Sequence, residues 1–357
     1  MALSSLFIQS LRNLNEVELF FASKNVFYGD NGSGKTSVLE AIHMLATGRS
    51  FRAAHGLVIQ KDAPALYLRG VLTPLDGGHP LKIALQKSRN NQHVMKCAGQ
   101  EVSSITEIAK HLPVQVLHLL NYQLLQTSPE ARRKLIDWGV FHVKHSFLSQ
   151  WREFNQLLKQ RNACLRQQRR PDAVWDDLLV KASIHIHEMR REVCEGWFSH
   201  ADPMIAELLE LPDISLNYSP GWDIQESLES VFLNHINRDL QLGYTYAGPQ
   251  RADLQIKTQN TPAQHVLSQG QQKRLVTGLQ ISQSIWVDEQ NAREGVLLVD
   301  DLPAELDANA QLQIMRIMTK MKAQVFLTCV DETTARHLAE ILGAKLFHVK
   351  HGVVNAV

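Results

Sequence analysis

Residues 29–36 read Gly29-Asp30-Asn31-Gly32-Ser33-Gly34-Lys35-Thr36, which fits the pattern G-x-x-x-x-G-K-[ST]. A short apolar run at residues 25–28 precedes this stretch, and residues 36–45 carry apolar side chains at helical spacing after it. Between a strand and a helix, such a loop turns backbone N–H groups toward phosphate oxygens, and the helix N-terminus adds positive partial charge. The stretch therefore predicts a nucleotide site in an α/β fold, with Lys35 on the β- and γ-phosphates and the Thr36 hydroxyl on Mg²⁺.

A second apolar run ends in two acids and reads Val296-Leu297-Leu298-Val299-Asp300-Asp301. Continuous apolar runs of this kind, here and at residues 325–328, are typical of buried strands in a parallel sheet. Asp300 would complete the Mg²⁺ shell, and Asp301 stands where a carboxylate can activate water. Lys35 and Asp300 are 265 residues apart (300 − 35), far more than a simple phosphate-loop domain needs. We therefore expect an ATPase core that is split by an insertion, with Lys35, Asp300 and Asp301 as its catalytic residues.

A third motif lies 30 residues ahead of Asp300 (300 − 270) and reads Ser268-Gln269-Gly270-Gln271. A helical pattern follows it, for which Ser268 is a good N-cap, and Gly270 permits close approach of another backbone. Composition alone leaves a plain capped helix open. The position of the motif just ahead of the strand that ends in Asp300 is the reason to consider a functional role for it.

Composition excludes several classes of protein. The chain has 357 residues, of which 44% are hydrophobic and 20% are charged, as in globular proteins of about two domains. The sequence contains no membrane-length apolar run, and its first residues lack the basic region and long apolar region of a secretion signal, so we do not expect secretion. The four cysteines are far apart and form no CxxC pair, which excludes a zinc finger and a disulfide framework. A reducing cytoplasm is the expected compartment.

Positive charge is concentrated in one segment, although the whole chain has a net charge of only +1. Residues 131–170 contain ten Lys and Arg against two acids, a charge of +8, so the remainder carries −7. A solvated helix face is the usual role of such a segment. Within a nucleotide-dependent DNA protein it is the best candidate for duplex backbone contact. The candidate DNA contacts are Arg132, Arg133, Lys134, Arg152, Lys159, Arg161, Arg166, Arg169 and Arg170.

Two further patterns favour structural roles. Leu312, Met315, Met318 and Met321 recur at helical spacing, which predicts a stripe that packs in the core. His185 and His187 lie two residues apart in a helical region and so point to different faces, which argues against a metal site there.

The motifs together resemble the ABC-type ATPase heads of the SMC and RecF group, and within it the bacterial RecF family of recombination repair. The resemblance extends from Arg12 to Asp307. It rests on the phosphate loop, the Ser268–Gln271 signature, Asp300-Asp301, Glu305-Leu306-Asp307, Arg12-Asn13, Gly48-Arg49-Ser50-Phe51-Arg52, Ser128-Pro129-Glu130-Ala131-Arg132-Arg133 with Asp137-Trp138, and Gly248-Pro249-Gln250-Arg251-Ala252-Asp253-Leu254.

The resemblance implies an ATP-dependent DNA clamp. ATP and Mg²⁺ would bind at residues 29–36 with Arg12 and Asn13, and Ser268–Gln271 would reach the nucleotide of a second subunit. Asp307 would line the dimer seam. Dimerisation on ATP around gapped or junction DNA, slow hydrolysis and release would follow. A RecR-like partner, and functionally RecO- and RecA-like proteins, are implied, with recombinase loading on single-stranded gaps in recombinational repair and replication restart as the outcome.

Several residues depart from the family pattern. The family usually has Pro-Glu-Asp where this chain has Leu119-Leu120-Asn121, a glycine where it has Thr127, and a histidine where it has Gln250. Gln123 is therefore only a weak candidate for the glutamine that reaches Mg²⁺. Asp301 is one methylene shorter than the glutamate of most ABC heads, so we expect slow turnover. A scaffold that binds ATP without hydrolysing it stays open, as does another ABC-type ATPase subunit, such as that of a transporter.

We expect three parts in the chain. Residues 1–120 would form the N-terminal part of the ATPase head, 121–240 a largely helical basic arm without a long coiled coil, and 241–357 the C-terminal part of the head.

Overall fold

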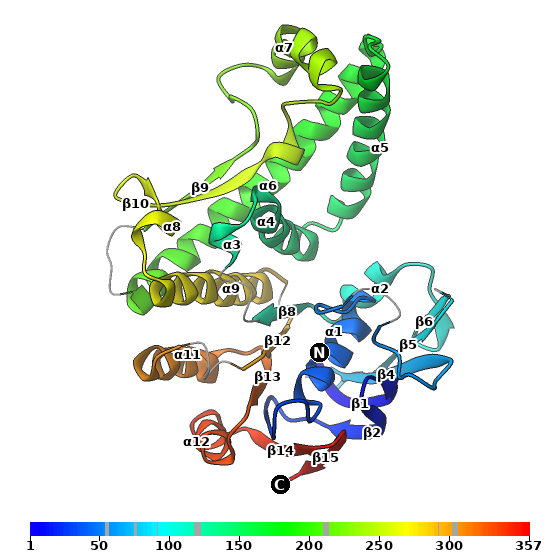
Figure 1. Cartoon of the computed structure of the whole chain (residues 1–357), viewed down its shortest axis with the longest axis vertical. Helices are drawn as coiled ribbons and strands as arrows, with labels where there is room; N and C mark the ends of the chain where they lie inside the picture. Colours follow the sequence, from blue (N-terminus) through cyan, green and yellow to red (C-terminus); the bar gives the residue numbers. More distant parts are fainter. Residues whose placement is uncertain are drawn as a thin grey trace. The chain divides into compact units, whose positions relative to one another are not determined.

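The computed structural model describes residues 1–53, 57–74, 77–90, 92–117, 123–209, 214–291, 293–301 and 306–357. These divide into two compact units, one formed by Met1–Asn121 with Asp288–Val357 and the other by Tyr122–Val287 (Figure 1). The second unit therefore reaches Val287, and residues 241–287, which we expected in the ATPase head, belong to it. The physical reason is that the hydrophobic core of this unit includes side chains such as Leu254, Leu275 and Val287.

An antiparallel sheet opens the first unit. Its strand order is β2-β1-β4-β5-β6-β7. In β1, Leu6 and Ile8 are completely buried. The strands are β1 (Ala2–Leu11), β2 (Leu14–Phe20), β4 (Ala65–Thr73), β5 (Leu81–Ser88), β6 (His93–Cys97) and β7 (Gln100–Glu101).

A second sheet of the same unit is parallel except at one edge. Its order is β15-β14-β3-β13-β12-β8, and only the β14–β15 pair is antiparallel. Every residue of β12 and β13 is buried, as their continuous apolar runs predict. The strands are β3 (Lys24–Tyr28), β8 (Val114–Leu117), β12 (Val296–Val299), β13 (Gln324–Cys329), β14 (Lys345–Lys350) and β15 (Val353–Ala356).

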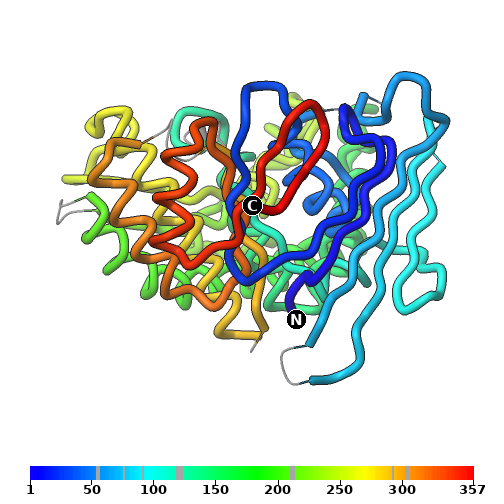
Figure 2. The backbone as a smooth tube through the Cα atoms, turned by 90° about the horizontal axis from the view of Figure 1, so that it is seen from below, coloured from blue at the N-terminus to red at the C-terminus, as the bar shows by residue number. Residues whose placement is uncertain are grey.

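Helix α1 (Lys35–Thr47) shares one hydrophobic core with both sheets. Val38, Leu39, Ile42 and Leu45 are completely buried, so the helical spacing read from the sequence marks its buried face. Figure 2 shows the C-terminal strand pair beside the N-terminal strands, although they come from opposite ends of the chain.

The remaining helices of the first unit are α2 (Ile105–Ala109), α11 (Ala308–Lys320) and α12 (Glu332–Leu342). In α11, Met315 and Met318 are buried as expected. The expectation is wrong for Leu312, which is 44% exposed, because it lies at a position of the helix turned away from the core. Met321 is buried but follows the end of the helix.

The second unit is mainly helical. Its helices are α3 (Gln123–Gln126), α4 (Pro129–Val143), α5 (Phe147–Arg166), α6 (Ala173–Leu209), α7 (Leu228–Leu242), α8 (Ala263–Val266) and α9 (Gln269–Asn291), the last of which runs into the first unit from Asp288. A small antiparallel sheet, in the order β11-β10-β9, is made of β9 (Ile214–Ser219), β10 (Asp253–Thr258) and β11 (Thr261–Pro262). A short 3₁₀ helix, η2 (Pro249–Arg251), precedes β10. The fold is thus α/β with a helical insertion, and no long coiled coil occurs among the described residues.

Candidate functional site

The phosphate loop joins β3, a central strand of the parallel sheet, to the N-terminus of α1. The Lys35 side chain is only 5% exposed and curls back over the loop. Its Nζ donates to the carbonyl oxygens of Gly29 at 2.7 Å and of Asp30 at 3.1 Å. These contacts hold the ammonium group over the loop that would cradle phosphate, where a lysine serves as a positive point charge.

The carboxylate of Asp300 lies beside the Thr36 hydroxyl. Asp300 follows β12 and Thr36 follows β3, and both strands pair with β13, so their carboxyl ends meet at one edge of the sheet. The Thr36 Oγ1 donates to Asp300 Oδ1 at 2.9 Å. A hydroxyl and a carboxylate side by side are the hard oxygen ligands that Mg²⁺ takes in phosphate-loop proteins, so these residues fit the metal.

Thr328, the penultimate residue of β13, orients both acids. Its Oγ1 donates to Asp300 Oδ1 at 2.9 Å and accepts a hydrogen bond from the Asp301 backbone N–H, also at 2.9 Å. The backbone of Asp301 is left-handed, with φ +53°. Our sequence analysis missed this role of Thr328, and the only available signal was a threonine at the end of an apolar strand.

Cys329 follows Thr328 and is the last residue of β13. Burial, together with the nearby Asp301 carboxylate, raises the pKa of the Cys329 thiol to about 12. At neutral pH this thiol is protonated, so it does not act as a proton acceptor in the site.

Asn13 braces the phosphate loop from the turn between β1 and β2. Its Nδ2 donates to the carbonyl oxygens of Gly32 at 3.2 Å and of Ser33 at 2.9 Å, and its Oδ1 accepts from Ser37 Oγ at 3.3 Å. The side chain of Asn13, a predicted ATP-binding residue, therefore supports the phosphate loop by bonding to the backbone of the loop.

The turn between β14 and β15 closes over the same loop. The Gly352 N–H donates to the Ser33 carbonyl oxygen at 2.8 Å. A Cβ at Gly352 would lie 2.0 Å from the Asn13 carbonyl oxygen, and one at Gly29 would lie 2.1 Å from the Val349 carbonyl oxygen. Both glycines also have positive φ, so no other residue fits either position without displacing the loop. No motif in the sequence predicts this C-terminal support.

Arg12 is held by a buried carboxylate. Glu40 on α1 has a completely buried side chain, and Arg12 Nη2 donates to it at 2.9 Å. Ser50 also donates to Glu40, and Arg52 lies 3.7 Å from it. Burial alone would raise the pKa of Glu40, but the hydrogen bonds from Arg12 and Ser50 with the positive charges of Arg12 and Arg52 outweigh it and lower this pKa. Arg12, a predicted ATP-binding residue, stays 25% exposed at its side chain beside the loop.

The Ser268–Gln271 signature forms the N-terminus of α9 in the second unit. Ser268 Oγ accepts from the Gln271 N–H at 3.3 Å, while Gln271 Oε1 accepts from the Ser268 N–H at 2.9 Å, which is a reciprocal capping box. Ser268, Gln269 and Gly270 are exposed. Apart from its chain neighbours and the adjacent backbone of α9, no described atom lies within 4 Å of the Cβ that a side chain at Gly270 would carry.

Comparison with known proteins decides the family. A family model described as the RecF/RecN/SMC N terminal domain matches residues 2–354. The DNA replication and repair protein RecF of Pseudomonas syringae pv. tomato is 39% identical, over 99% of this chain and 98% of that protein. The same protein of Stutzerimonas stutzeri is 39% identical, over 99% and 97%. The chain belongs to the RecF family. Its relatives are proteins of DNA replication and repair, as the resemblance of the motifs implies.

Solved structures agree on the fold of this RecF-family chain. The structure of the recombination mediator protein RecF-ATP in the RecFOR pathway matches with a TM-score of 0.87 and 23% identity, over 99% of this chain and 97% of that one. An SMC head bound to the C-winged helix domain of ScpA matches with a TM-score of 0.61 and 14% identity, over 100% and 97%. The ABC-type ATPase head with a helical insertion is thus the shared architecture.

The candidate DNA contacts of the RecF-family chain divide into two groups. Lys134, Arg152, Lys159, Arg166, Arg169 and Arg170 are exposed. Arg132 instead forms a two-pronged ion pair with Asp253 at 2.7 and 3.0 Å, and Arg133 donates to the Ala252 carbonyl oxygen at 2.8 Å. These two arginines fix α4 to the Gly-Pro motif at the start of β10.

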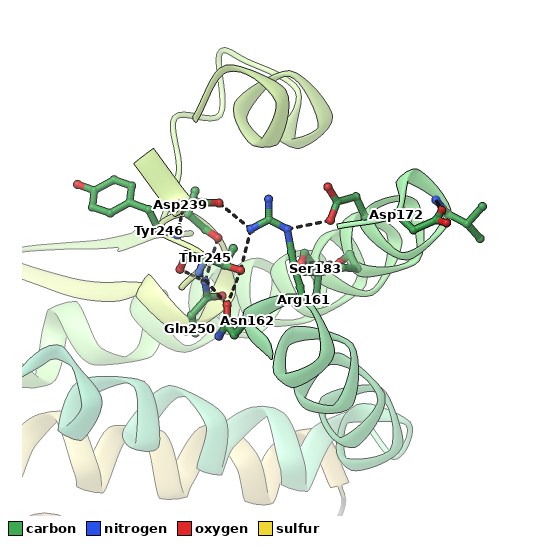
Figure 3. A network of polar contacts seen from close by, with 12 residues as sticks. Arg161, Asn162, Asp172, Ser183, Asp239, Thr245, Tyr246 and Gln250 are labelled. Carbon is green, nitrogen blue, oxygen red and sulfur yellow. Dashed lines mark hydrogen bonds and ion pairs between the residues drawn. The ribbon is translucent and has the colours of Figure 1, made fainter. Parts of the chain in front are cut away.

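Arg161 is a correction to the predicted DNA surface. It is 2% exposed, and its guanidinium contacts Asp176 at 2.8 Å. The guanidinium also contacts Asp239 at 2.6 Å (Figure 3). The polar partners of Arg161 lie 15 or more residues away in the chain, so the charge run alone could not separate it from its exposed neighbours.

The remaining predicted residues lie as follows. Asp307 caps α11, accepting from the Ala310 N–H at 3.0 Å, and is exposed. Gln123 begins α3, but its side chain, Leu119-Leu120-Asn121 and Glu305 are outside the described residues. The His187 ring packs on Tyr218 and Trp222, and the described residues include no cluster of three metal-ligating side chains. Among the described helices, none has the length and apolar character needed to cross a bilayer.

Proposed function

We propose that this chain is an ATP-gated DNA clamp, which binds Mg²⁺-ATP in the phosphate loop and dimerises on it. One observation carries the proposal: the Thr36 hydroxyl lies beside the Asp300 carboxylate, next to the phosphate loop that the Lys35 side chain contacts. When bound, Mg²⁺ would neutralise phosphate charge between these two residues. The matched structure named RecF-ATP supports the choice of nucleotide.

The signature supports a site shared between two subunits. Glycine inside a helix costs about 1 kcal/mol relative to alanine. Within this chain nothing described requires Gly270 to lack a side chain, because the space around it is open. We infer that the requirement comes from a partner, and that Ser268, Gly270 and the N-terminus of α9 approach the nucleotide held by a second subunit, with Asp307 at the seam.

DNA is the proposed cargo of this dimer. The exposed basic residues at positions 152, 159, 166, 169 and 170 of the second unit are suited to phosphate contacts. Family membership and the RecFOR pathway named for the matched structure favour gapped or junction DNA and RecR-, RecO- and RecA-like partners. We propose a cytoplasmic protein of recombinational repair that helps recombinase to load on single-stranded gaps.

Hydrolysis would be slow and would release the dimer. Asp301, which the Thr328 hydroxyl orients through its backbone, is the proposed water-activating carboxylate. Asp301→Asn should abolish phosphate release while leaving ATP binding intact. Equal ATP turnover by the Asp301→Asn variant and the parent would reject this role for Asp301. Absence of turnover in the parent, with and without DNA, would favour the scaffold that binds ATP without hydrolysing it.

Light-scattering mass in Mg²⁺-ATP and in ADP tests dimerisation directly. We expect ATP to double the mass of the parent, and Ser268→Arg to prevent this. Ser227 is a matched control, because it is an exposed serine that caps the N-terminus of α7 in the same unit. Ser227→Arg loses a cap in the same way and should still dimerise. A monomer mass under all conditions, including added gapped DNA, would reject the clamp.

A further inference from the structure

A buried polar network fixes the loop that follows α7. Thr245 is 2% exposed, and its Oγ1 accepts from Arg161 Nη1 at 2.8 Å while its N–H donates to Asn162 Oδ1 at 2.8 Å. The next N–H, of Tyr246, donates to Asp239 Oδ1 at 2.9 Å, and Gln250 donates to the Thr245 carbonyl oxygen (Figure 3). The backbone of this loop is therefore held in one conformation.

Burial alternates along the fixed loop, so two aromatic rings point outward. Thr245 and Ala247 are buried, whereas Tyr244 is 38% and Tyr246 is 40% exposed. Figure 3 shows the Tyr246 ring directed away from the network that holds its backbone. A tyrosine ring on a rigid backbone loses little conformational entropy when a flat ligand stacks on it.

An arginine accompanies each exposed tyrosine. The Arg238 guanidinium carbon lies 3.4 Å from the centre of the Tyr246 ring, and that of Arg251 lies 5.0 Å from the centre of the Tyr244 ring. Both arginines are exposed, and neither has a carboxylate partner in the part of the chain that the structure describes. A third exposed arginine, Arg166 at the end of α5, is the nearest neighbour of Gly243.

We propose that Tyr244 and Tyr246, with Arg238, Arg251 and Arg166, form a site that stacks the unpaired bases of single-stranded DNA. The proposal deepens the DNA clamp proposed above and rests on it. Aromatic rings accept the faces of any base, and nearby unpaired cations hold the phosphates between those bases. From the sequence, the basic segment is a candidate for duplex contact. The fold brings Tyr244, some 78 residues after Arg166 (244 − 166), to the end of that segment, because Arg166 lies beside the neighbouring Gly243.

Unpaired bases fit this surface better than a duplex or a protein. In a duplex the base faces are covered by their neighbours, so two outward tyrosine rings would add nothing to its binding. A protein partner would need acidic groups for three exposed arginines, whereas a DNA strand supplies a phosphate with every base. The surface would thus recognise the single-stranded side of a gap, while the exposed basic residues of α5 contact the duplex side.

Binding of two DNA probes by the full-length chain in Mg²⁺-ATP tests the proposal. The probes are a fluorescent oligothymidine of about 20 nucleotides, long enough to cover such a site, and a blunt duplex of the same length. Tyr244→Ala with Tyr246→Ala should weaken oligothymidine binding by roughly 10-fold or more and leave duplex binding within about 2-fold. Tyr244→Phe with Tyr246→Phe should bind both probes as the parent does, because stacking needs only the ring.

Phe20→Ala is the matched control, since Phe20 is a 60% exposed aromatic residue of the first unit. It should bind both probes as the parent does. A second measurement, on the unmutated protein, is photocrosslinking of an oligonucleotide that contains 5-iodouracil, and we expect the crosslinks at residues 244 and 246.

Three outcomes would overturn the inference. The first is that the double alanine variant binds oligothymidine as tightly as the parent does. The second is that this variant loses as much affinity for the duplex as for the single strand. The third is that the crosslinks map only outside residues 238–251. If the parent binds neither probe, the DNA clamp itself fails. A parent that binds both probes without any dependence on the tyrosines rejects only the stacking site.

Discussion

Glu40 shows how one buried residue determines both stability and its pH dependence. The carboxylate is completely buried and receives Arg12 and Ser50, so Glu40→Gln should lower the free energy of unfolding at pH 7 by about 2 kcal/mol. Because the folded pKa of Glu40 is lowered, its contribution is complete above the unfolded pKa of about 4.3 and is lost as pH falls through the folded pKa. Denaturant titrations at pH 7, 5 and 4 should therefore show the difference between parent and variant narrowing only in acid.

The exposed pair of Glu18 and Arg69 provides the control for Glu40. Their side chains are about half exposed and 3.4 Å apart, so Glu18→Gln should change stability by less than about 0.5 kcal/mol at every pH. A Glu40→Gln loss that persisted unchanged at low pH would show that packing, and not the charge of Glu40, stabilises this part of the fold.

Loss of the Thr328 hydroxyl alone should have a large effect on ATP turnover. Thr328→Val keeps the volume but removes the hydroxyl that orients Asp300 and Asp301, so we expect about 10-fold lower ATP turnover or weaker Mg²⁺ dependence. Thr328→Ser keeps the hydroxyl and should retain most of the parent's turnover. Phosphate release measured over a Mg²⁺ titration separates the two variants. Identical titration curves for the Thr328→Val variant and the parent would contradict the positioning role of Thr328.

At the scale of elements, helix α5 carries two cations that look alike in sequence and should behave oppositely. Arg161→Met leaves Asp239 buried without its ion-pair partner and should cost about 3–5 kcal/mol of stability. Lys159 is exposed, so Lys159→Met should change stability by less than about 0.5 kcal/mol. It should reduce the slope of log affinity against log salt for duplex DNA by about 0.9, if it contacts one phosphate. Unfolding midpoints and salt titrations of both variants check this, and reversed effects would reject the assignment.

The same helix explains which features the sequence could predict. The phosphate loop, α1 and strands β12 and β13 follow from residues within one element, where period and motif are local. The burial of Arg161 depends on Asp239, 78 residues away, and the bracing of the phosphate loop by Gly352 depends on a turn more than 300 residues later. No local pattern encodes such contacts, which is why Thr328, Gly352 and the Tyr244–Tyr246 pair came only from the structure.

At the scale of the whole molecule, the division into units reflects packing and not the order of motifs. The signature at Ser268–Gln271 belongs by motif to the ATPase head, but α9 contributes Leu275, Leu279 and Trp286 to the core of the second unit. A boundary placed by family motifs at residue 241 therefore differs from one placed by side-chain contacts. Phosphate loop and signature thus lie on separate compact units of each chain.

Mixing two inactive variants tests whether these two parts meet across subunits. Lys35→Ala removes the phosphate-loop lysine and Ser268→Arg blocks the signature, so each variant alone should have negligible ATP turnover. In a mixed dimer with twofold symmetry of its backbone, one site combines both defects and the other combines an intact loop with an intact signature. Because neither variant is expected to form homodimers, the dimers of an equal mixture are mixed dimers with one working site of two, so we expect recovery to at most about half of the parent's turnover at the same total concentration.

The matched control for the mixture pairs Lys35→Ala with Asp300→Asn. Both residues belong to the same half of the site, since Asp300 accepts from Thr36 next to Lys35 in one chain. In a mixed dimer of these two variants each site keeps one defect, so turnover should stay negligible. Recovery in the Lys35–Ser268 mixture but not in the Lys35–Asp300 mixture requires that a nucleotide contact the signature of the other subunit. If neither mixture recovers ATP turnover, the loop and the signature of one chain would instead contact the same nucleotide. The clamp would then need a different dimer.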